Sequence, residues 1–586
     1  MAATIDNRSE ITKVWKLTPP SPLAPQLAAE AGLSLLQAQL LINRRITDKA
    51  EARAFCSPRM TGLLDPLLLP DMDRALALIL PAIEKRRNIT IYGDYDADGL
   101  TATALLLNFF AELGLPVAYY IPNRLFEDYG LHPAAVEKLA QAGAELIITV
   151  DCGTSNQQAI MLAEQKGIQV VVTDHHKLPR DLNPLCPIVN PQRLEQASPF
   201  KDLAGVGLAF FLAVALRAAL REKGRFQNRP EPDLRNYLDL VALGTVADLV
   251  PLVGQNRILV KNGLERMPAS CWPGLMALQE CAELEPTAVT AYDLAFKLGP
   301  RLNAAGRMGT AITGLKTLTA PNAIAARDLA RELNTLNIQR QAIEKKIVQQ
   351  IEALINDHPD WAQQKAWVLA KEGWHQGVLG VVASKIMDKY HRPTLILNIQ
   401  DGVAKGSGRS LDGFDLFQAL SSVQHLLLRF GGHYHAAGLA LSTLHLEELT
   451  GALQALAQEQ IKPETLRPQI RVDAAIGLEE LTRETMRQIL DLAPFGTNNP
   501  EPVFLCEAVE IVEARILADK HLKLRVHQNQ TVMEAIGFGL AGKYRADGKI
   551  NLVCAPEINR YRGLESIQLR ILDLEPVGTA TKVVKG

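Results

Sequence analysis

The chain has 586 residues, too many for one hydrophobic core, so it is expected to fold into several domains. Hydrophobic residues make up 47% and charged residues 22% of the sequence. These shares are ordinary for a folded protein and exclude a disordered chain or one embedded in a membrane. The net charge of −2 gives no overall sign of nucleic-acid binding, so any such binding must come from local sites.

The sequence shows no clear targeting signal and no disulfide pattern. Residues 1–20 lack the apolar core of a signal peptide, and the longest apolar run, 203–216, is too short to span a bilayer. The seven cysteines form no CxxC pair, and their number is odd. We therefore expect a reduced, cytoplasmic protein without membrane contact.

Residues 1–87 are predicted to be mainly helical, because apolar residues recur at helical spacing around 33–41 and 76–83. From 88 to about 253 strands and helices alternate. Predicted strands at 117–121, 146–150 and 168–173 are separated by predicted helices at 133–143 and 156–166. This alternation predicts a doubly wound parallel sheet with helices on both faces.

An acidic loop carries the main chemical signal. Asp94, Asp96 and Asp98 follow the β-branched run 89–92 and precede a helical run at 101–113. Three carboxylates at alternate positions favour a bound cation. A solvated acidic turn is one alternative, and a calcium-binding EF-hand loop is another. The EF-hand is disfavoured because Leu105 stands where a bidentate Glu should close the site and because a strand precedes the loop.

Further acidic and imidazole side chains follow other predicted strands. Asp151 ends the strand at 146–150, and Asp174, His175 and His176 end the strand at 168–173. Because the carboxyl ends of parallel strands meet at one edge of a sheet, these groups are expected to form one cluster. Asp248, which follows the apolar segment 238–243, is a further candidate; alternatively it is a helix C-terminal aspartate in solvent.

The composition of this cluster indicates the metal and the reaction. Carboxylates with a few imidazoles suit Mn²⁺ or Mg²⁺ better than zinc. A bridging carboxylate can hold two such ions close together, as in two-metal phosphoryl transfer. Hydrolysis of phosphoesters is therefore the predicted reaction.

Together with five further strings in order, the cluster resembles the DHH phosphoesterase superfamily and, within it, the RecJ family of single-strand-specific 5′→3′ exonucleases. The strings are 203–207, 299–307, 374–378, 406–410 and 431–433, and the resemblance spans about 85–575. It implies a metal-dependent exodeoxyribonuclease that releases 5′-mononucleotides from single-stranded DNA in DNA repair and recombination. A relative acting on short oligonucleotides or cyclic dinucleotides and a non-catalytic DNA-replication scaffold are the alternatives.

The resemblance also implies metal ligands. Asp96 would bind the first ion, Asp98 the second, and Asp151 both; His175 and Asp248 would complete the second site.

Asp94, Asp174 and His176 match positions needed for activity, with His176 facing the substrate phosphate. Many superfamily members have a His where this chain has Tyr92. The first site is therefore expected to lack one protein ligand, with Asp94 or water in its place.

A second α/β domain is predicted at about 366–458. Its glycine-rich string 406–410 is typical of backbone amides approaching an anion, or of a tight turn beside a surface Arg. The resemblance implies a DHHA1-type substrate domain in which Ser407 and Arg409 hold the terminal 5′ phosphate. Further substrate contacts are expected from Arg301, Asn303, Arg307 and His433.

Between these domains, an apolar stripe after Pro321 predicts one long amphipathic connecting helix that ends before Pro359; a coiled-coil helix is the alternative. From about 470 to 577 alternating patterns predict a β-rich domain. The resemblance implies an OB-like β-barrel there. Its nucleic-acid groove would use Lys520, Lys523, Arg525, Arg560, Tyr561 and Arg562, unless these residues form a solvated strand face.

The predicted domains are therefore 1–87, 88–270 (catalytic), 271–365 (substrate-contacting segment and long helix), 366–465 (substrate-binding) and 466–578 (nucleic-acid-binding). Single-stranded DNA is the expected partner, together with a helicase and a single-strand-binding protein. We expect the chain to act as a monomer.

Overall fold

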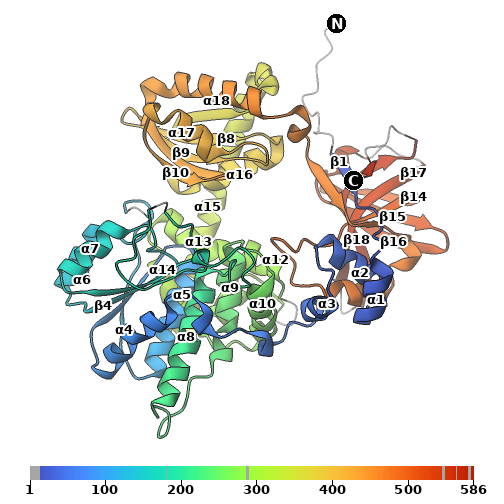
Figure 1. Cartoon of the computed structure of the whole chain (residues 1–586). Helices are drawn as coiled ribbons and strands as arrows, with labels where there is room; N and C mark the ends of the chain where they lie inside the picture. Colours follow the sequence, from blue (N-terminus) through green and yellow to red (C-terminus); the bar gives the residue numbers. More distant parts are fainter. Residues whose placement is uncertain are drawn as a thin grey trace. The chain divides into compact units, whose positions relative to one another are not determined.

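The computed structural model describes residues 13–127, 129–179, 181–285, 289–543, 548–561, 564–578 and 583–585. The chain forms two compact units, whose helices and strands are labelled in Figure 1. The parallel-sheet unit contains Ala54–Arg340 and Ala493–Pro500. The barrel unit contains Met1–Arg53, Gln341–Leu492 and Glu501–Gly586.

The parallel-sheet unit is built on five parallel strands in the order β3-β2-β4-β5-β6. They are β2 (Ile89–Gly93), β3 (Ala118–Tyr120), β4 (Leu146–Val150), β5 (Gln169–Thr173) and β6 (Ile188–Val189). The chain moves from β2 to β3 in one direction and then returns past β2 to β4, so the topological switch point lies between β2 and β4. The predicted doubly wound sheet is confirmed.

Different helices cover the two faces of this sheet, because successive side chains of a strand point to opposite sides. Ile148 belongs to a core with α4 (Met72–Glu84), α5 (Ala97–Glu112) and α8 (Gly205–Glu222). The neighbouring Ile147 belongs to a core with α6 (Pro133–Gln141) and α7 (Gln157–Gln165). Burial of both faces explains why β2 and β4 have no exposed position.

Helix α5 begins four residues earlier than its apolar run predicts. The Asp96 carboxylate accepts hydrogen bonds from the backbone amides of Asp98 (3.0 Å) and Gly99 (3.1 Å) and so caps the helix. Asp96 is thus the N-cap and Asp98 lies in the first turn, instead of both lying in a free loop. The sequence predicted a loop for the whole acidic string and did not indicate that one of its carboxylates caps the helix.

The rest of this unit is helical. Its helices are α9 (Leu238–Ala247), α10 (Gly254–Arg266), α11 (Pro273–Cys281), α12 (Ala291–Asp293), a π-helical turn (Leu294–Leu298), α13 (Gly299–Met308) and α14 (Ile312–Leu318). They share a core with α5. The predicted connecting helix is α15 (Ala323–Asp357), whose residues belong to the parallel-sheet unit up to Arg340 and to the barrel unit from Gln341.

In the barrel unit, a mixed sheet has the order β10-β11-β9-β8-β7. Its strands are β7 (Trp367–Glu372), β8 (Thr394–Gln400), β9 (Val403–Arg409), β10 (Leu427–His433) and β11 (Ala436–Ser442). Helices α16 (Leu379–Tyr390), α17 (Leu416–Ser422) and α18 (Leu446–Gln460) pack on it. This is the predicted second α/β domain.

The glycine-rich string 406–409 lies inside the central strand β9, so the alternative of a tight turn is wrong. A Cβ atom on Gly406 would lie 2.0 Å from the backbone oxygen of Ile396 on β8. This glycine is therefore needed for close approach of two strands rather than for a turn.

The predicted β-barrel is present and closed, with the order β14-β15-β16-β18-β17 and a further pairing of β17 with β14. Its strands are β14 (Phe504–Leu517), β15 (His521–Gln528), β16 (Thr531–Gly537), β17 (Lys549–Tyr561) and β18 (Leu564–Pro576). The short strand β13 (Ala474–Ala475) pairs with β14, and α19 (Arg483–Leu490) follows it in the chain. Leu522, Leu524 and Val526 are buried and alternate with charged residues, as the period-two pattern predicts.

The N-terminal region contains the expected helices, α1 (Ala24–Ala31), α2 (Leu35–Asn43) and α3 (Lys49–Cys56), but also a strand that the sequence did not indicate. This strand, β1 (Val14–Leu17), pairs in parallel with β12 (Gln469–Val472) and β19 (Val583–Lys585). Trp15 on β1 is fully buried and its indole N–H donates to Asp573 at 2.9 Å. A strand of four residues with partners so distant in sequence leaves no local periodic signal.

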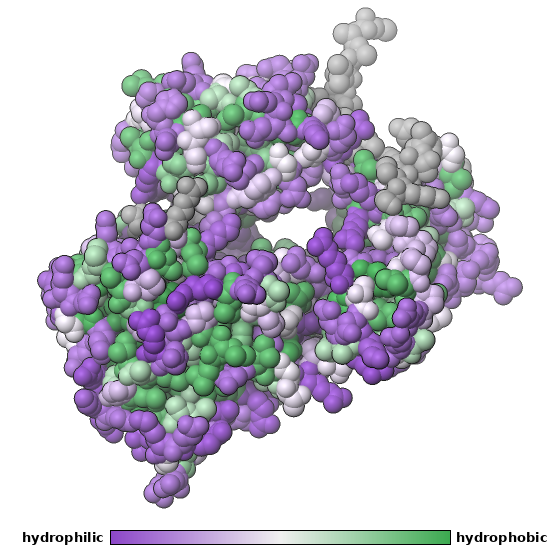
Figure 2. Space-filling model, in the orientation of Figure 1, coloured by the Kyte–Doolittle hydropathy of each residue, from purple (hydrophilic) through white to green (hydrophobic). Residues whose placement is uncertain are grey.

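Hydrophilic residues are spread over the face drawn in Figure 2, with hydrophobic patches between them. Among the helices of the described segments, none combines the length and the apolar character needed to cross a membrane.

Candidate active site

The carboxyl end of β2 places three carboxylates at the switch point. Asp94 and Asp98 are buried, and Asp98 accepts hydrogen bonds from the backbone amides of Gly205 (2.7 Å) and Val206 (2.8 Å) at the start of α8. A Cβ atom on Gly99 would lie 2.7 Å from Cβ of Asp94, so only glycine permits this close packing. These contacts fix the carboxylates on two helix N-termini.

Asp151, at the end of the neighbouring strand β4, is buried and has a φ of +61°. Aspartate is one of the few residues that adopts this left-handed conformation at modest cost, and such backbone strain clusters at functional sites. Gly205 packs directly against it, because a Cβ atom there would lie 2.6 Å from Cβ of Asp151. The start of α8 therefore packs against Asp151 and donates hydrogen bonds to Asp98.

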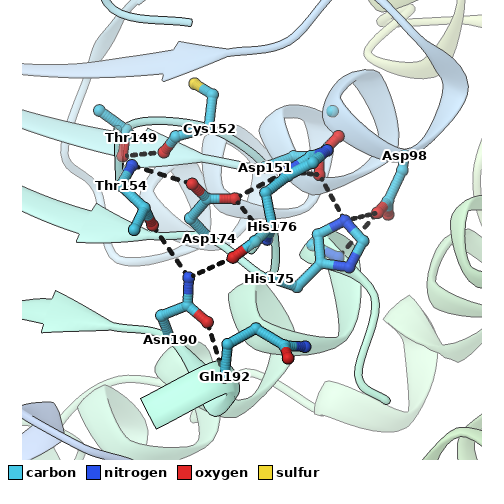
Figure 3. A network of polar contacts seen from close by, with 12 residues as sticks. Asp98, Thr149, Asp151, Cys152, Thr154, Asp174, His175, His176, Asn190 and Gln192 are labelled. Carbon is cyan, nitrogen blue, oxygen red and sulfur yellow. Dashed lines mark hydrogen bonds and ion pairs between the residues drawn. The ribbon is translucent and has the colours of Figure 1, made fainter. Parts of the chain in front are cut away.

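The end of β5 supplies Asp174, His175 and His176 (Figure 3). Asp174 accepts hydrogen bonds from the amides of Thr154 (2.9 Å) and His176 (3.1 Å), and its Oδ1 lies 2.8 Å from Nδ1 of His176. These hydrogen bonds orient the His176 ring from one side.

His175 points into the cluster. Its Nε2 lies 3.1 Å from Oδ1 of Asp151, 3.5 Å from Oδ2 of Asp248 and 3.9 Å from Oδ2 of Asp98. Asp248 is the C-cap of α9, so it lies at the C-terminus of a helix, as the alternative interpretation predicted. The side chain is nevertheless only 24% exposed and faces the other groups.

Three sets of side chains in this cluster each offer ligand atoms within 4.8 Å of one another. The sets are Asp94, Asp96 and Asp151; Asp98, His175 and Asp248; and Asp151, His175 and His176. Asp151 belongs to two of them, as a bridging carboxylate would, and so does His175.

The buried atoms of the cluster fit divalent metal ions. Within the described residues, Oδ1 of Asp94 is buried without a hydrogen-bond partner, and Oδ1 of Asp151 and Nε2 of His175 are buried 3.1 Å apart without forming a hydrogen bond. Burying such polar atoms is costly unless a cation meets them. The donors are mainly carboxylate oxygens, as Mn²⁺ and Mg²⁺ prefer.

The electrostatics of the site agree with this fit. Burial, together with neighbouring carboxylates, raises the pKa of Asp98 to about 7 and that of Asp248 to about 8. Burial likewise raises the pKa values of Asp94 and Asp151. Burial also lowers the pKa of His175, which favours the neutral imidazole that a metal ligand needs.

In the barrel unit, Ser407 and Arg409 lie against the first turn of α16. A Cβ atom on Gly380, in that turn, would lie 3.1 Å from Nη2 of Arg409 and 3.6 Å from Oγ of Ser407. A helix N-terminus beside an Arg and a hydroxyl is a suitable place for a phosphate. His433 lies on the exposed strand β10 of the same sheet.

Three segments of the chain match known domain families. Residues 88–245 match the DHH family, N-terminal domain; residues 363–462 match the DHHA1 domain; and residues 472–573 match the RecJ OB domain.

Whole proteins are also similar to this chain. It is 39% identical over 537 residues to the single-stranded-DNA-specific exonuclease RecJ of Dickeya dadantii (strain 3937), an alignment that covers 88% of this chain and 92% of that protein. The chain belongs to the RecJ family.

Solved structures agree with this assignment. The structure of RecJ from Thermus thermophilus in complex with Mn²⁺ matches with a TM-score of 0.81 and 30% identity, covering 96% of this chain and 79% of that one. The corresponding Mg²⁺ complex matches with a TM-score of 0.75 and 29% identity, covering 98% and 79%.

Tyr92 stands where many members of the superfamily have a histidine. In this member of the RecJ family its side chain does not face the cluster. Its ring is fully buried and stacks on Tyr120 at 5.2 Å, and its hydroxyl donates to the backbone oxygen of Gly130 at 2.8 Å. The set nearest this strand consists of carboxylates alone, Asp94, Asp96 and Asp151.

Tyr129 is a member of the site that the sequence did not single out. Its hydroxyl donates to the backbone oxygen of Asp151 at 2.8 Å and lies 2.9 Å from Nδ1 of His176. Its ring also meets Tyr95, over which Arg124 lies at 4.8 Å. A single tyrosine in a loop carries no motif, so only the structure brings it to the cluster.

The predicted substrate contacts on α13 differ in their surroundings. The Asn303 side chain accepts a hydrogen bond from the Ala97 amide at 2.8 Å, and so holds the acidic end of α5. Burial raises the pKa of Tyr95, and the positive charge of Arg307 opposes this rise. Arg301 instead donates to Asn334 (3.0 Å) and to the backbone oxygen of Lys297 (2.7 Å), contacts that stabilise the helices. The substrate-binding roles of all three stay predictions.

The barrel offers a groove of about 570 Å³ whose basic residues are paired with acids. Lys523 lies 3.0 Å from Glu534, and Arg525 lies 3.5 Å from Glu513. These cross-strand pairs reduce the positive potential that the sequence suggested for the groove. Arg562 and the side chain of Tyr561 lie outside the described residues.

Proposed function

We propose that this protein is a single-stranded-DNA-specific exonuclease that hydrolyses phosphodiester bonds with two Mn²⁺ or Mg²⁺ ions. The observation that carries the proposal is the cluster at the β2/β4 switch point, where carboxylate and imidazole groups converge and several of their buried atoms make no hydrogen bond within the described chain. The RecJ-family sequence around the cluster supports single-stranded DNA as the substrate.

In this proposal the ions are held by the sets defined above. Asp94, Asp96 and Asp151 would hold the first ion, and Asp98, His175 and Asp248 the second. Asp151, whose Oδ1 lies 3.1 Å from Nε2 of His175, would contribute to both. When bound, such ions polarise a phosphate and lower the pKa of water.

A histidine of the cluster is placed to bind the substrate phosphate. Burial lowers the pKa of His176, but the hydrogen bond and the charge of Asp174 outweigh this and raise it to about 9. Asp174 therefore favours the protonated ring, which can donate an N–H to a phosphate oxygen. Tyr129 and Asp174 hold this ring in place.

Digestion from the 5′ end with release of 5′-mononucleotides is part of the proposal, as is a role in DNA repair and recombination. It is supported by Ser407 and Arg409 at the N-terminus of α16, which suit a terminal 5′ phosphate. We further propose a cytoplasmic monomer that works with a helicase and a single-strand-binding protein. The seven cysteines, all free, are consistent with a reducing compartment.

Substitution of Asp98 tests the metal site. Asp98→Ala should lower the rate of single-stranded DNA cleavage by more than about 100-fold, because a direct ligand should matter more than the outer contacts of a metal site. Asp98→Asn, which keeps one acceptor for the α8 amides, should lose activity as well. Binding of a single-stranded oligonucleotide in EDTA should stay within about twofold of wild type.

Asp328→Ala is the matched control, because Asp328 is an exposed aspartate in the same unit. Near-normal cleavage by both Asp98 variants would refute the metal assignment.

A further inference from the structure

An exposed pair of aromatic rings stands out on the parallel-sheet unit. Tyr292 is 63% exposed and Phe296 is 64% exposed, and their ring centroids are 4.7 Å apart. Single exposed apolar side chains are normal, but two adjacent large rings left in water call for a binding explanation.

The backbone explains why the rings lie side by side. Thr290 and Asp293 form a capping box that starts the helix. The next turn is π-helical, and the Gly299 amide bonds to the Leu294 oxygen. Pro300 has no amide hydrogen, and its ring would clash with the carbonyl of Phe296 in a regular helix, so the wider turn accommodates it.

The turn that carries the rings is packed into the core of the unit. Leu294 and Leu298, on the same π-helical turn, are fully buried. A Cβ atom on Gly299 would lie 3.0 Å from Cβ of Ala247, the last residue of α9 before Asp248. The rings are therefore presented on a turn that is packed against the helix carrying a predicted metal ligand.

The same helical segment continues into the site. Seven residues beyond Phe296, Asn303 on α13 holds the Ala97 amide at the acidic end of α5. At a rise of 1.5 Å per residue this is roughly 10 Å along the helix axis. A stacked strand covers this distance in about three nucleotides.

We propose that Tyr292 and Phe296 form a stacking platform for nucleobases of the single-stranded DNA substrate. This inference rests on the proposed function and adds a specificity device to it. Unpaired bases offer their faces to aromatic rings, whereas paired bases in a duplex do not, and stacking tolerates any sequence. The platform would thus favour single strands without reading their sequence.

Charge and area favour bases over other ligands. Lys297 lies on the same turn, but its Nζ is 2.8 Å from Oδ1 of Asp293, so the nearby positive charge is compensated. The platform should therefore contribute little to the salt dependence of binding. Two rings also offer far less than the roughly 800 Å² per partner of a stable protein interface.

The test measures binding of a 5′-phosphorylated single-stranded oligonucleotide in EDTA, where no cleavage occurs. The double variant Tyr292→Ala/Phe296→Ala should bind roughly 5- to 30-fold more weakly than wild type, with an unchanged salt slope. Tyr292→Phe should bind like wild type. Ile324→Ala removes another exposed apolar side chain of the same unit and is the matched control.

A second set of oligonucleotides carries abasic sites at successive positions from the 5′ end. Wild type should lose affinity when the bases about three to five nucleotides from the end are missing, and the double variant should be indifferent to them. A thermal melt checks that the variants are folded, and cleavage of a dinucleotide too short to reach the rings should be unaffected.

Equal affinity of wild type and double variant for the intact oligonucleotide, or an equal loss for both at abasic sites, would overturn the platform. A wild-type protein that neither binds nor cleaves single-stranded DNA would instead overturn the proposed function, so the two failures are distinguishable.

Discussion

At the scale of single residues, the geometry of the cluster depends on how Asp151 is held. Its positive φ turns the carboxylate toward the other ligands, and the missing side chain of Gly205 leaves room for it. The amide of Gly205 also donates to Asp98, so one glycine contacts two predicted ligands, one in the first turn of α5 and one directly after β4.

Gly205→Ala should therefore reduce cleavage by on the order of 100-fold, because the new methyl group displaces Asp151 and small misplacements are costly in catalysis. The affinity for Mn²⁺, measured by calorimetry, should fall as well. The new methyl group of Gly207→Ala, on the same helix, comes no closer than 3.2 Å to another atom, at the tip of the Leu203 side chain, and this variant should behave like wild type. Similar Mn²⁺ affinities for both variants would contradict the account of Asp151.

Most of the residues in the cluster could be predicted, because Asp94, Asp151 and the Asp-His-His string each follow a recognisable β-strand. Asp248 was less certain, because nothing local distinguishes it from an ordinary helix C-cap. Tyr129 could not be predicted. Its hydrogen bonds join a loop to Asp151 and His176, which lie 22 and 47 residues away.

At the scale of elements, helices and strands with strong local periodicity were predicted reliably, whereas a strand that depends on long-range pairing was not. The strands β4 and β5 and the long helix α15 follow the sequence pattern closely. The glycine-rich part of β9 was misread because glycine signals a turn locally but serves here for strand contact. β1 escaped notice because its four residues find their partners near the other end of the chain.

Trp15→Ala tests the importance of β1. Removing this buried ring and its hydrogen bond to Asp573 should destabilise the barrel unit by about 3–5 kcal/mol. Denaturant unfolding followed by circular dichroism measures the loss. Affinity for Mn²⁺ should not change, because the predicted ligands belong to the other unit.

Lys16→Ala, on the same strand but exposed, serves as the control. An unaltered unfolding transition for Trp15→Ala would mean that β1 is dispensable to the barrel unit.

At the scale of the whole molecule, the two units divide the proposed work. The parallel-sheet unit holds the predicted metal ligands and the aromatic pair, and the barrel unit holds the predicted phosphate-binding residues Ser407 and Arg409 and the OB-like barrel. A net charge near zero fits this division, because the basic residues of the barrel groove are largely paired with acids. Affinity for long strands is then expected from several small sites together rather than from one basic surface.

The most direct test of the central claim follows a single-stranded DNA labelled at its 3′ end and incubated with the protein and Mn²⁺ or Mg²⁺. Progressive shortening of the labelled strand is expected. It should stop when the 5′ end is blocked, when the strand is made duplex, or when EDTA is added. Binding without any shortening in the presence of either metal would contradict the account and favour a non-catalytic scaffold.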